Sequence, residues 1–287
     1  MKPASIIFLI VSVVVIAAGL GLCFTSANMA EKQGIQLFEA EKLTDGDIRH
    51  TIDFSETELN RISLNVTAAV VNICRGDRSY CEIINFPAGT YSANLTAQSF
   101  TLDDSLNIFS IMNFAESGFE FKGVRQYLQY YNKTGFHKRQ KAVNIYIAPS
   151  DKLNVIDLDG TESQLTISDI SAKTDYRIEM MHGTVDINNV STSSTMTINA
   201  SESDIIIKSR NIKECSVDAS NSSVSVVLIN PDTQTFDLAV DDGEIVYLGT
   251  ILENEFKTDI PISTVKIRVR LTGGNIVVYD WNSLEQN

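Results

Sequence analysis

Apolar and polar residues alternate in a pattern that recurs along the chain. In "IEMMHGTVDI" an apolar-x-apolar pair is followed by a short turn at a small residue and by a second such pair. Alternation with a period of two predicts β-strands with one buried face. The second pair starts five residues after the first pair ends, an odd step that reverses the face of a straight strand. We therefore expect a bend at the small residue, so that both pairs point into one core.

The same template returns several times. Its small residue stands at Gly183, Ser203, Ser222, Gly243 and Gly274. The first four of these recur about every 20 residues, and a longer gap precedes the last. An upstream copy covers Leu64 to Ile73, and a shortened copy covers Phe100 to Ile108. A unit of about 20 residues is too small for its own core, so units must stack.

The stacking gives a fold class. The sequence predicts an all-β fold, a β-solenoid-like stack of two-strand repeats, with Val185, Ile205, Val224 and Ile245 in one interior row. An ordinary β-sandwich with evenly spaced strands is the alternative.

The first 24 residues contain one long apolar run. Residues 5–24 carry no charge, and as a helix they would span about 30 Å, the thickness of a bilayer core. Lys2 precedes the run, so the positive-inside tendency leaves the N-terminus in the cytoplasm and the rest outside. A cleaved signal peptide, cut near Thr25-Ser26-Ala27, is the alternative, but the run exceeds the usual length of a signal core. We expect a single-pass cell-membrane protein whose C-terminal domain is extracytoplasmic.

These patterns give a domain organisation. The expected parts are a cytoplasmic tip (1–4), a transmembrane anchor (5–24), a linker (25–50), an extracytoplasmic β-repeat domain (51–281) with an aromatic and basic insertion (110–141), and a tail (282–287).

Charge is distributed unevenly. The formal net charge of −13 argues against a nucleic-acid partner, since binding phosphate needs a basic footprint. Asp151 to Ile260 accounts for all of it, whereas the insertion carries a local +4. A candidate surface-binding patch in the insertion comprises Lys122, Arg125, Tyr127, Tyr130, Tyr131, Lys133, Lys138 and Arg139. Such a patch suits an anionic membrane surface or wall polymer; alternatively, its aromatic residues form a lid that caps the stack.

The ordered series of repeats resembles a known family. The stretches "RISLNVTAAVVNICRGD", "VNIYIAPSDKLNVIDLDG" and "YRIEMMHGTVDINNV" are similar to the bacterial putative-adhesin family, membrane-anchored proteins with an extracytoplasmic β-strand repeat domain of unassigned activity. The resemblance implies an all-β repeat fold in the bacterial cell envelope, with a link to adhesion or to the envelope-stress response. It supplies no catalytic residues.

Two cysteines flank an Arg-Gly-Asp tripeptide. Cys74 and Cys81 lie on either side of Arg75-Gly76-Asp77, where the repeat template places a turn, and a disulfide between them would staple a hairpin. Gly and Asp are expected at such a turn for backbone reasons, so we interpret the tripeptide as a turn rather than an adhesion ligand.

Catalytic and metal-binding signals are weak. The three histidines, His50, His137 and His182, have no metal-ligand spacing. "DLDGTE", from Asp157 to Glu162, contains part of a calcium-loop pattern but lacks the remaining ligands. We therefore expect no cofactor, no metal and no enzymatic activity.

The sequence as a whole predicts a non-catalytic binding or scaffolding module of the cell envelope. Its expected partners are the cytoplasmic membrane, through the N-terminal helix, and an envelope protein or anionic wall polymer. A self-assembling structural β-solenoid and a carbohydrate-active enzyme are the alternatives.

Overall fold

The computed structural model describes residues 49–55, 57–86, 91–104, 113–115, 118–120, 139–170, 173–190, 194–209, 212–260, 263 and 265–284. The expected anchor, residues 5–24, lies outside this set. Within the set, no helix is long and apolar enough to cross a bilayer. The described residues all belong to one compact unit. The described part is almost entirely strand, which confirms the all-β prediction.

The strands are β1 (Arg49–Asp53), β2 (Arg61–Thr67), β3 (Ala69–Arg75), β4 (Tyr80–Ile84), β5 (Ser92–Leu95), β6 (Ser99–Asp103), β7 (Asn113–Ala115), β8 (Gly118–Glu120), β9 (Lys141–Ile147), β10 (Val155–Thr161), β11 (Gln164–Ser168), β12 (Asp175–Met181), β13 (Thr184–Asn188), β14 (Thr195–Ser201), β15 (Asp204–Ser209), β16 (Glu214–Leu228), β17 (Thr235–Tyr247), β18 (Thr250–Leu252), β19 (Glu255–Lys257) and β20 (Lys266–Asp280). Two short helical turns are η2 (Pro231–Thr233) and α4 (Trp281–Leu284). β7 and β8 pair with each other in a separate two-stranded sheet.

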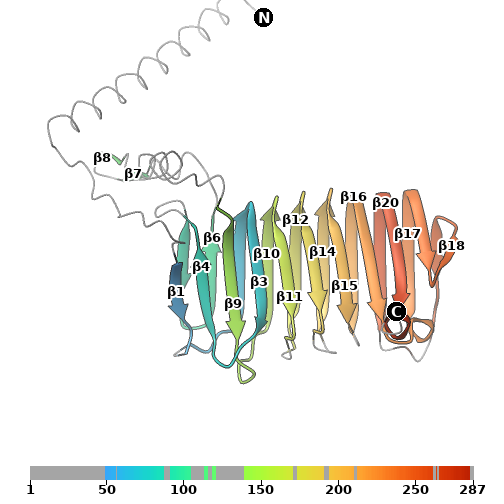
Figure 1. Cartoon of the computed structure of the whole chain (residues 1–287), viewed down its shortest axis with the longest axis horizontal. Helices are drawn as coiled ribbons and strands as arrows, with labels where there is room; N and C mark the ends of the chain where they lie inside the picture. The colour runs from blue at the N-terminus through green and yellow to red at the C-terminus, as the bar shows by residue number, and fades with distance from the viewer. Residues whose placement is uncertain are drawn as a thin grey trace, which may run out of the picture. The chain divides into compact units, whose positions relative to one another are not determined.

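The other 18 strands form two layers joined by bends (Figure 1). Layer 1 has the order β5-β6-β2-β10-β12-β14-β16-β20-β17-β19. Layer 2 has the order β1-β4-β9-β3-β11-β13-β15-β16-β20-β17-β18. The long strands β16, β17 and β20 pass through the bend and contribute one half to each layer. Pairing is parallel between units and antiparallel only towards the two ends of each layer.

The register follows the spacing seen in the sequence. Val155 of β10 pairs with Asp175 of β12, which pairs with Thr195 of β14, so each unit advances by one repeat of the sequence. The interior row predicted from the sequence is confirmed and is longer than expected. It consists of Val143, Val71, Leu165, Val185, Ile205, Val224, Ile276 and Ile245, all at most 1 % exposed.

The order of units departs from chain order at both ends of the stack. β20, the last strand of the chain, lies between β16 and β17. The β2–β3 unit lies inside β6 and β9 rather than at the edge. In the shortened copy, only Phe100 and Leu102 fall on a described strand, and β9 supplies the layer 2 strand of this unit. The aromatic and basic insertion therefore interrupts a unit instead of joining two of them.

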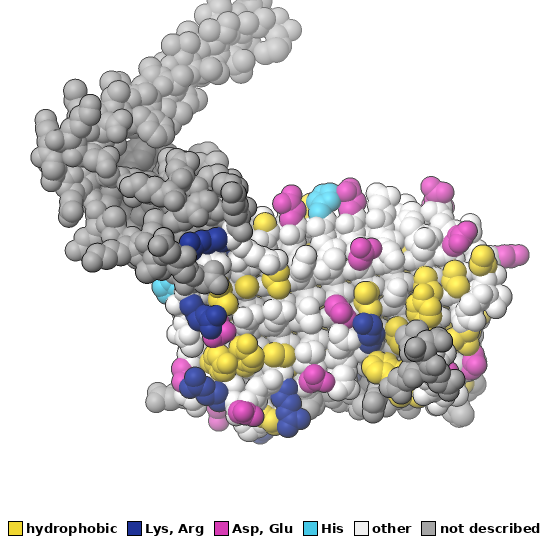
Figure 2. Space-filling model, viewed as in Figure 1, with side chains coloured by type: hydrophobic (Ala, Val, Ile, Leu, Met, Phe, Trp, Pro, Cys, Tyr) yellow, Lys and Arg dark blue, Asp and Glu magenta, His cyan; other side chains and the backbone are white. Residues whose placement is uncertain are grey.

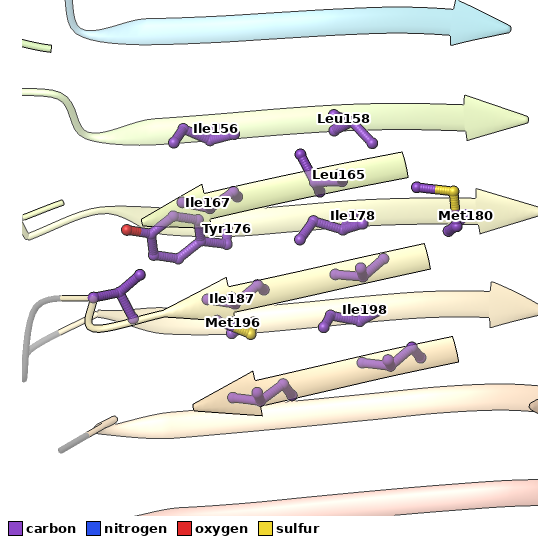
Figure 3. Packing of buried hydrophobic residues seen from close by; sticks show 14 of the residues in the cluster. Ile156, Leu158, Leu165, Ile167, Tyr176, Ile178, Met180, Ile187, Met196 and Ile198 are labelled. Atoms are coloured by element: carbon purple, nitrogen blue, oxygen red, sulfur yellow. The ribbon is translucent and has the colours of Figure 1, made fainter. Parts of the chain in front are cut away.

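The core lies between the two layers. Inward side chains of both layers belong to one hydrophobic cluster, as Figure 3 shows for Ile167 and Ile187 of layer 2 and Tyr176, Ile178 and Ile198 of layer 1. Burying this apolar surface, at about 25 cal/mol per Å², is the main force that holds the units together. Because every inward row continues from one unit to the next, each unit covers the core of its neighbours.

The bend is built differently from the sequence-based expectation. The left-handed backbone conformation falls on the residue before each small residue: Ala68, Glu162, His182, Glu202, Asn221, Asp242 and Gly273 all have φ between 48° and 79°. Where the small residue is a serine, its side chain instead connects neighbouring bends. The hydroxyl of Ser203 accepts a hydrogen bond from the backbone N–H of Gly183 (3.2 Å), and the hydroxyl of Ser222 accepts one from Ser203 (3.1 Å). These hydroxyls hold neighbouring bends together, which explains why a short side chain recurs there.

Candidate functional site

A groove crosses five neighbouring strands on the outer face of layer 1, close to the bend. It runs over β10, β12, β14, β16 and β20 and encloses about 580 Å³. One rim carries the outward side chains nearer the strand centres: Asp159, Glu179, Asn199, Asp218 and Arg270. The other rim carries the outward side chains next to the bend: Thr161, Met181, Ser201, Ser220 and Thr272.

The stacking register creates both rims. Asp159 pairs with Glu179, Glu179 with Asn199, and Asn199 with Asp218, so these side chains follow one another at the strand spacing of about 4.8 Å. Between the rims, the inward positions of β14 and β16 are occupied by Ala200 and Ala219, both half-buried. The two rims are successive outward rows of the same strands, so the groove is a consequence of the repeat itself.

The electrostatic field of the groove is negative. No ion pair among the described residues involves Asp159, Glu179 or Asp218, and all three side chains are exposed. Arg270, at one end, donates a 2.5 Å hydrogen bond to Asp237 Oδ2, which draws its guanidinium towards Asp237. Closely spaced carboxylates without counter-ions attract cationic groups, with a strength that salt reduces.

The neighbouring bends add charge beside the groove. Glu162, His182 and Glu202 occupy the left-handed position of three successive units. His182 Nδ1 lies 2.9 Å from Glu202 Oε2, and both side chains are about half exposed. Within the part of the chain that the structure describes, no three His, Cys, Asp or Glu side chains are grouped so that they could hold a metal ion. Asp157, Asp159 and Glu162 of the "DLDGTE" stretch lie on strand β10 and at the bend that follows it.

The structure does not bring the two predicted disulfide partners together. Cys74 faces outward on β3 and Cys81 faces inward on β4, with β9 between the two strands. Both are free thiols, as is the buried Cys215. The expectation of a staple is wrong because β3 and β4 do not form a hairpin. Burial raises the pKa of the Cys81 thiol. It also raises the pKa of the Cys74 thiol, to which the nearby Asp169 carboxylate adds a smaller rise. It raises the pKa of Cys215 to about 12.

The Arg-Gly-Asp tripeptide begins the connection from β3 to β4. Arg75 ends β3, and the backbone N–H of Gly76 donates to the carbonyl of Ile147 at the end of β9 (3.0 Å). A Cβ on Gly76 would lie 2.8 Å from the Cβ of Tyr146, so glycine is required by close packing. The stretch is a connection, as the sequence suggested, but it crosses the end of β9 and does not join two paired strands. Arg75 and Asp77 are exposed.

A buried ion pair closes the base of the insertion. Asp104 directly follows β6, Lys141 begins β9, and Lys141 Nζ donates to Asp104 Oδ2. Their side chains are 1 % and 8 % exposed, respectively. Burial raises the pKa of Asp104, although the charge of Lys141 opposes the rise. The predicted surface-binding patch lies outside the described residues except for Arg139, which is half-buried shortly before Lys141.

The groove was not predicted, although the sequence holds a signal for it. The acidic and amide positions 159, 179, 199 and 218 follow the repeat spacing, in phase with the outward face of the first strand of each unit. In the linear sequence this acidity shows only as the negative charge between Asp151 and Ile260. Aligning the outward positions of the repeats would have revealed the row.

Comparisons with known proteins give no family. No family model matches the chain, and no curated protein does. Among solved structures, the chain is similar to a putative cell adhesion protein from Clostridium sporogenes, with a TM-score of 0.46, 13 % identity, and coverage of 82 % of this chain and 99 % of the other. It is also similar to a putative adhesin from Bacteroides fragilis, with a TM-score of 0.42, 12 % identity, and coverage of 82 % and 98 %.

Proposed function

We propose that this protein is a non-catalytic binding or scaffolding module of the cell envelope, built as a β-solenoid and held at the cytoplasmic membrane by residues 5–24. In this proposal, the groove on layer 1 receives an extended partner that carries amino or guanidinium groups, such as a lysine-rich peptide segment or an amine-bearing polymer. The insertion, with its opposite charge, would contact an anionic wall polymer.

One observation carries the binding role. The groove presents three exposed carboxylates, an amide and four hydroxyls over five parallel strands, at the fixed spacing of the strands. A ligand with a compact shape would meet only one or two of these groups. An extended chain that lies across the strands would meet them in succession, and its cationic groups would gain from several carboxylates at once. The backbone ladders keep this row rigid, so little ordering cost falls on the protein side.

The experiment measures binding of a fluorescent oligolysine probe by anisotropy. The double variant Glu179→Gln with Asp218→Asn removes two rim charges and should weaken binding by roughly two- to thirtyfold at low salt, since each exposed charge contributes about 0.2–1 kcal/mol. The matched control is Asp204→Asn with Glu244→Gln, which removes two exposed charges from the outer face of layer 2. It should change binding less than about twofold, because only long-range attraction is lost. Equal weakening by both variants would mean that net charge alone attracts the probe, and the groove would lose its role.

The membrane and topology part has its own test. If residues 5–24 anchor the chain with the β region outside, protease added to cells with an intact cytoplasmic membrane and a permeable wall should digest that region. The chain should also stay in the membrane fraction at full mass. Complete protection from the protease, or release of a product that starts near Asn28, would refute the anchor.

A further inference from the structure

Exposed hydrophobic side chains concentrate at one end of the stack. Within the described residues, the exposed large hydrophobic side chains are Met181, Leu248, Ile251 and Tyr279. Met181 belongs to the groove, whereas the other three lie on or beside β17, β18 and β20. Ile251 on β18 is the most exposed, at 66 %. Hydrophobic side chains are visible on the surface at this end in Figure 2, near the place of β17 and β18 in Figure 1.

This end has two open strand edges, one in each layer. Within the described residues, β18 pairs only with the second half of β17, and β19 only with the first half. Ile251, at the centre of β18, lies beside Val246, and Phe256, at the centre of β19, lies beside Leu238. Val246 and Leu238 are equally far along the chain from the bend at Asp242. The two edge strands are therefore centred at the same distance from the bend, opposite each other across the core.

The edges are self-complementary. A two-fold axis perpendicular to both layers, lying just outside the two edge strands and level with their centres, pairs each edge strand with its own copy in the antiparallel direction. In layer 2, Ile251 then packs against Ile251 of the second copy. In layer 1, Glu255 lies opposite Lys257 of the second copy, and Lys257 opposite Glu255. Lys257 is available for this contact, since its side chain is 60 % exposed and its Asp237 and Glu255 contacts are long, at 3.8 and 3.7 Å.

We propose that a second copy of this chain binds at this end, through β18–β18 and β19–β19 pairing, to give a closed two-fold dimer. Each edge strand has only three residues, so few main-chain hydrogen bonds form and burial of Ile251 dominates the contact. None of the exposed large hydrophobic side chains lies on β1 or β5, the described edges at the other end. The assembly therefore stops at two copies. This surface is distinct from the groove and does not depend on the proposed function.

The test is sedimentation equilibrium of the full chain in a density-matched non-ionic detergent, from about 1 to 100 µM, a range that brackets a micromolar dissociation constant. The wild-type chain should sediment as a monomer–dimer equilibrium. Ile251→Asp should weaken the dimer by about thirtyfold or more, because two carboxylates would face each other at the axis. Met181→Asp is the matched control: it adds the same charge at the exposed hydrophobic residue that lies in the groove, and it should dimerise like the wild type.

A charge exchange tests the register without relying on Ile251. Glu255→Lys alone places like charges opposite each other twice and should weaken the dimer by about tenfold. Glu255→Lys combined with Lys257→Glu restores both pairs and should recover wild-type association. A monomeric wild-type chain over the whole range, assembly into open polymers, or no recovery in the double variant would overturn the proposal. So would an equal effect of Ile251→Asp and Met181→Asp.

Discussion

Gly274 is a residue at which a single added methyl group should destabilise the stack. It lies at the bend of β20, with φ of 113°, between the bends of β16 and β17. An added Cβ would lie 1.9 Å from the carbonyl oxygen of Ser222 and 2.9 Å from its carbonyl carbon. These are backbone atoms of the neighbouring unit, so no side-chain rotation relieves the clash. The substitution Gly274→Ala must push two units apart or distort the bend.

The loss of stability in Gly274→Ala has two causes, positive φ and steric overlap. A substitution at Gly249, where only positive φ applies, measures the first cause by itself. Gly249 has φ of 81°, and a Cβ there would meet no atom within 4 Å. Gly249→Ala therefore bears only the cost of positive φ for an L-residue, about 1–2 kcal/mol. Gly274→Ala adds overpacking, which costs about 1–3 kcal/mol in well-packed regions and falls here on backbone. We expect losses of about 1–2 kcal/mol for Gly249→Ala and about 2–5 kcal/mol for Gly274→Ala, with the latter towards the upper end because the clash falls on backbone.

Thermal unfolding followed by circular dichroism near 215 nm measures the difference. For a unit of this size, 1 kcal/mol corresponds to about 2–4 °C in Tm. Gly249→Ala should therefore melt about 2–8 °C lower than the wild type, and Gly274→Ala about 4–20 °C lower and below Gly249→Ala. The spectra at low temperature should show strand in all three proteins. If both variants melted at the same temperature, contact between neighbouring bends would not restrict residue 274, and the bend-to-bend packing described above would be wrong.

Three further predictions concern the core, the buried ion pair and the thiols. Ile205→Asp should destabilise the fold by about 3–5 kcal/mol or prevent folding, because it buries an unpaired carboxylate, whereas the neighbouring exposed Asp204→Asn should change the stability by less than about 0.5 kcal/mol in denaturant unfolding; equal effects would reverse the face assignment. Burial raises the pKa of Asp104 above its usual 3.8, so the carboxyl group binds its proton more tightly in the folded state than in the unfolded state. The free energy of unfolding therefore falls as pH rises from the unfolded-state pKa to the folded-state pKa of this group. Asp104→Asn removes the titrating group, so the free energy of unfolding of the variant should lack this pH dependence. The same pH dependence in variant and wild type from about pH 4 to pH 7 would contradict the raised pKa. Iodoacetamide should modify Cys74 in the folded protein and Cys215 only after denaturation, since the latter is 1 % exposed with a pKa of about 12; peptide mass mapping decides, and early labelling of Cys215 would argue against its burial.

The interior of the stack was predictable because burial imposes a period on the sequence. Val185, Ile205 and Val224 must be apolar in each unit, and their spacing gives the register directly. The order of units at the ends was not predictable in this way. The sequence shows only a longer gap between Gly243 and Gly274, whereas in the structure β17, β18 and β19 lie beyond β20. Strand neighbours depend on contacts between distant segments, and the repeat pattern is the same whichever neighbour a unit takes.

The bends and the cysteines show a second limit. Small residues marked the bends correctly, but the strained backbone falls on the preceding residue, which is Glu at 162 and 202 and His at 182. Glu and His are not residue types that predict a left-handed conformation. Backbone hydrogen bonds between neighbouring bends stabilise it here. Cys74 and Cys81 were expected to face each other because they flank a turn. β9, which follows the insertion much later in the chain, separates their strands, and nothing near the cysteines signals its position.

The interrupted unit explains how the stack accepts a long insertion without losing its register. In the β2–β3 unit a short bend leads from Asn65 to Ala69, whereas in the adjacent unit the whole insertion lies between Asp103 and Lys141, yet both ends pair in register with β2 and β3. The bend of a regular unit is held by backbone hydrogen bonds and a short side chain. Here the Asp104–Lys141 ion pair occupies that position, with the Lys141 ammonium 5.1 Å from the centre of the Phe86 ring. A buried pair is costly to break on one side only, since the remaining charge loses its partner in a low-dielectric site. It therefore fixes the distance between Asp104 and Lys141, the two ends of the insertion, and keeps layers 1 and 2 joined in register at this unit.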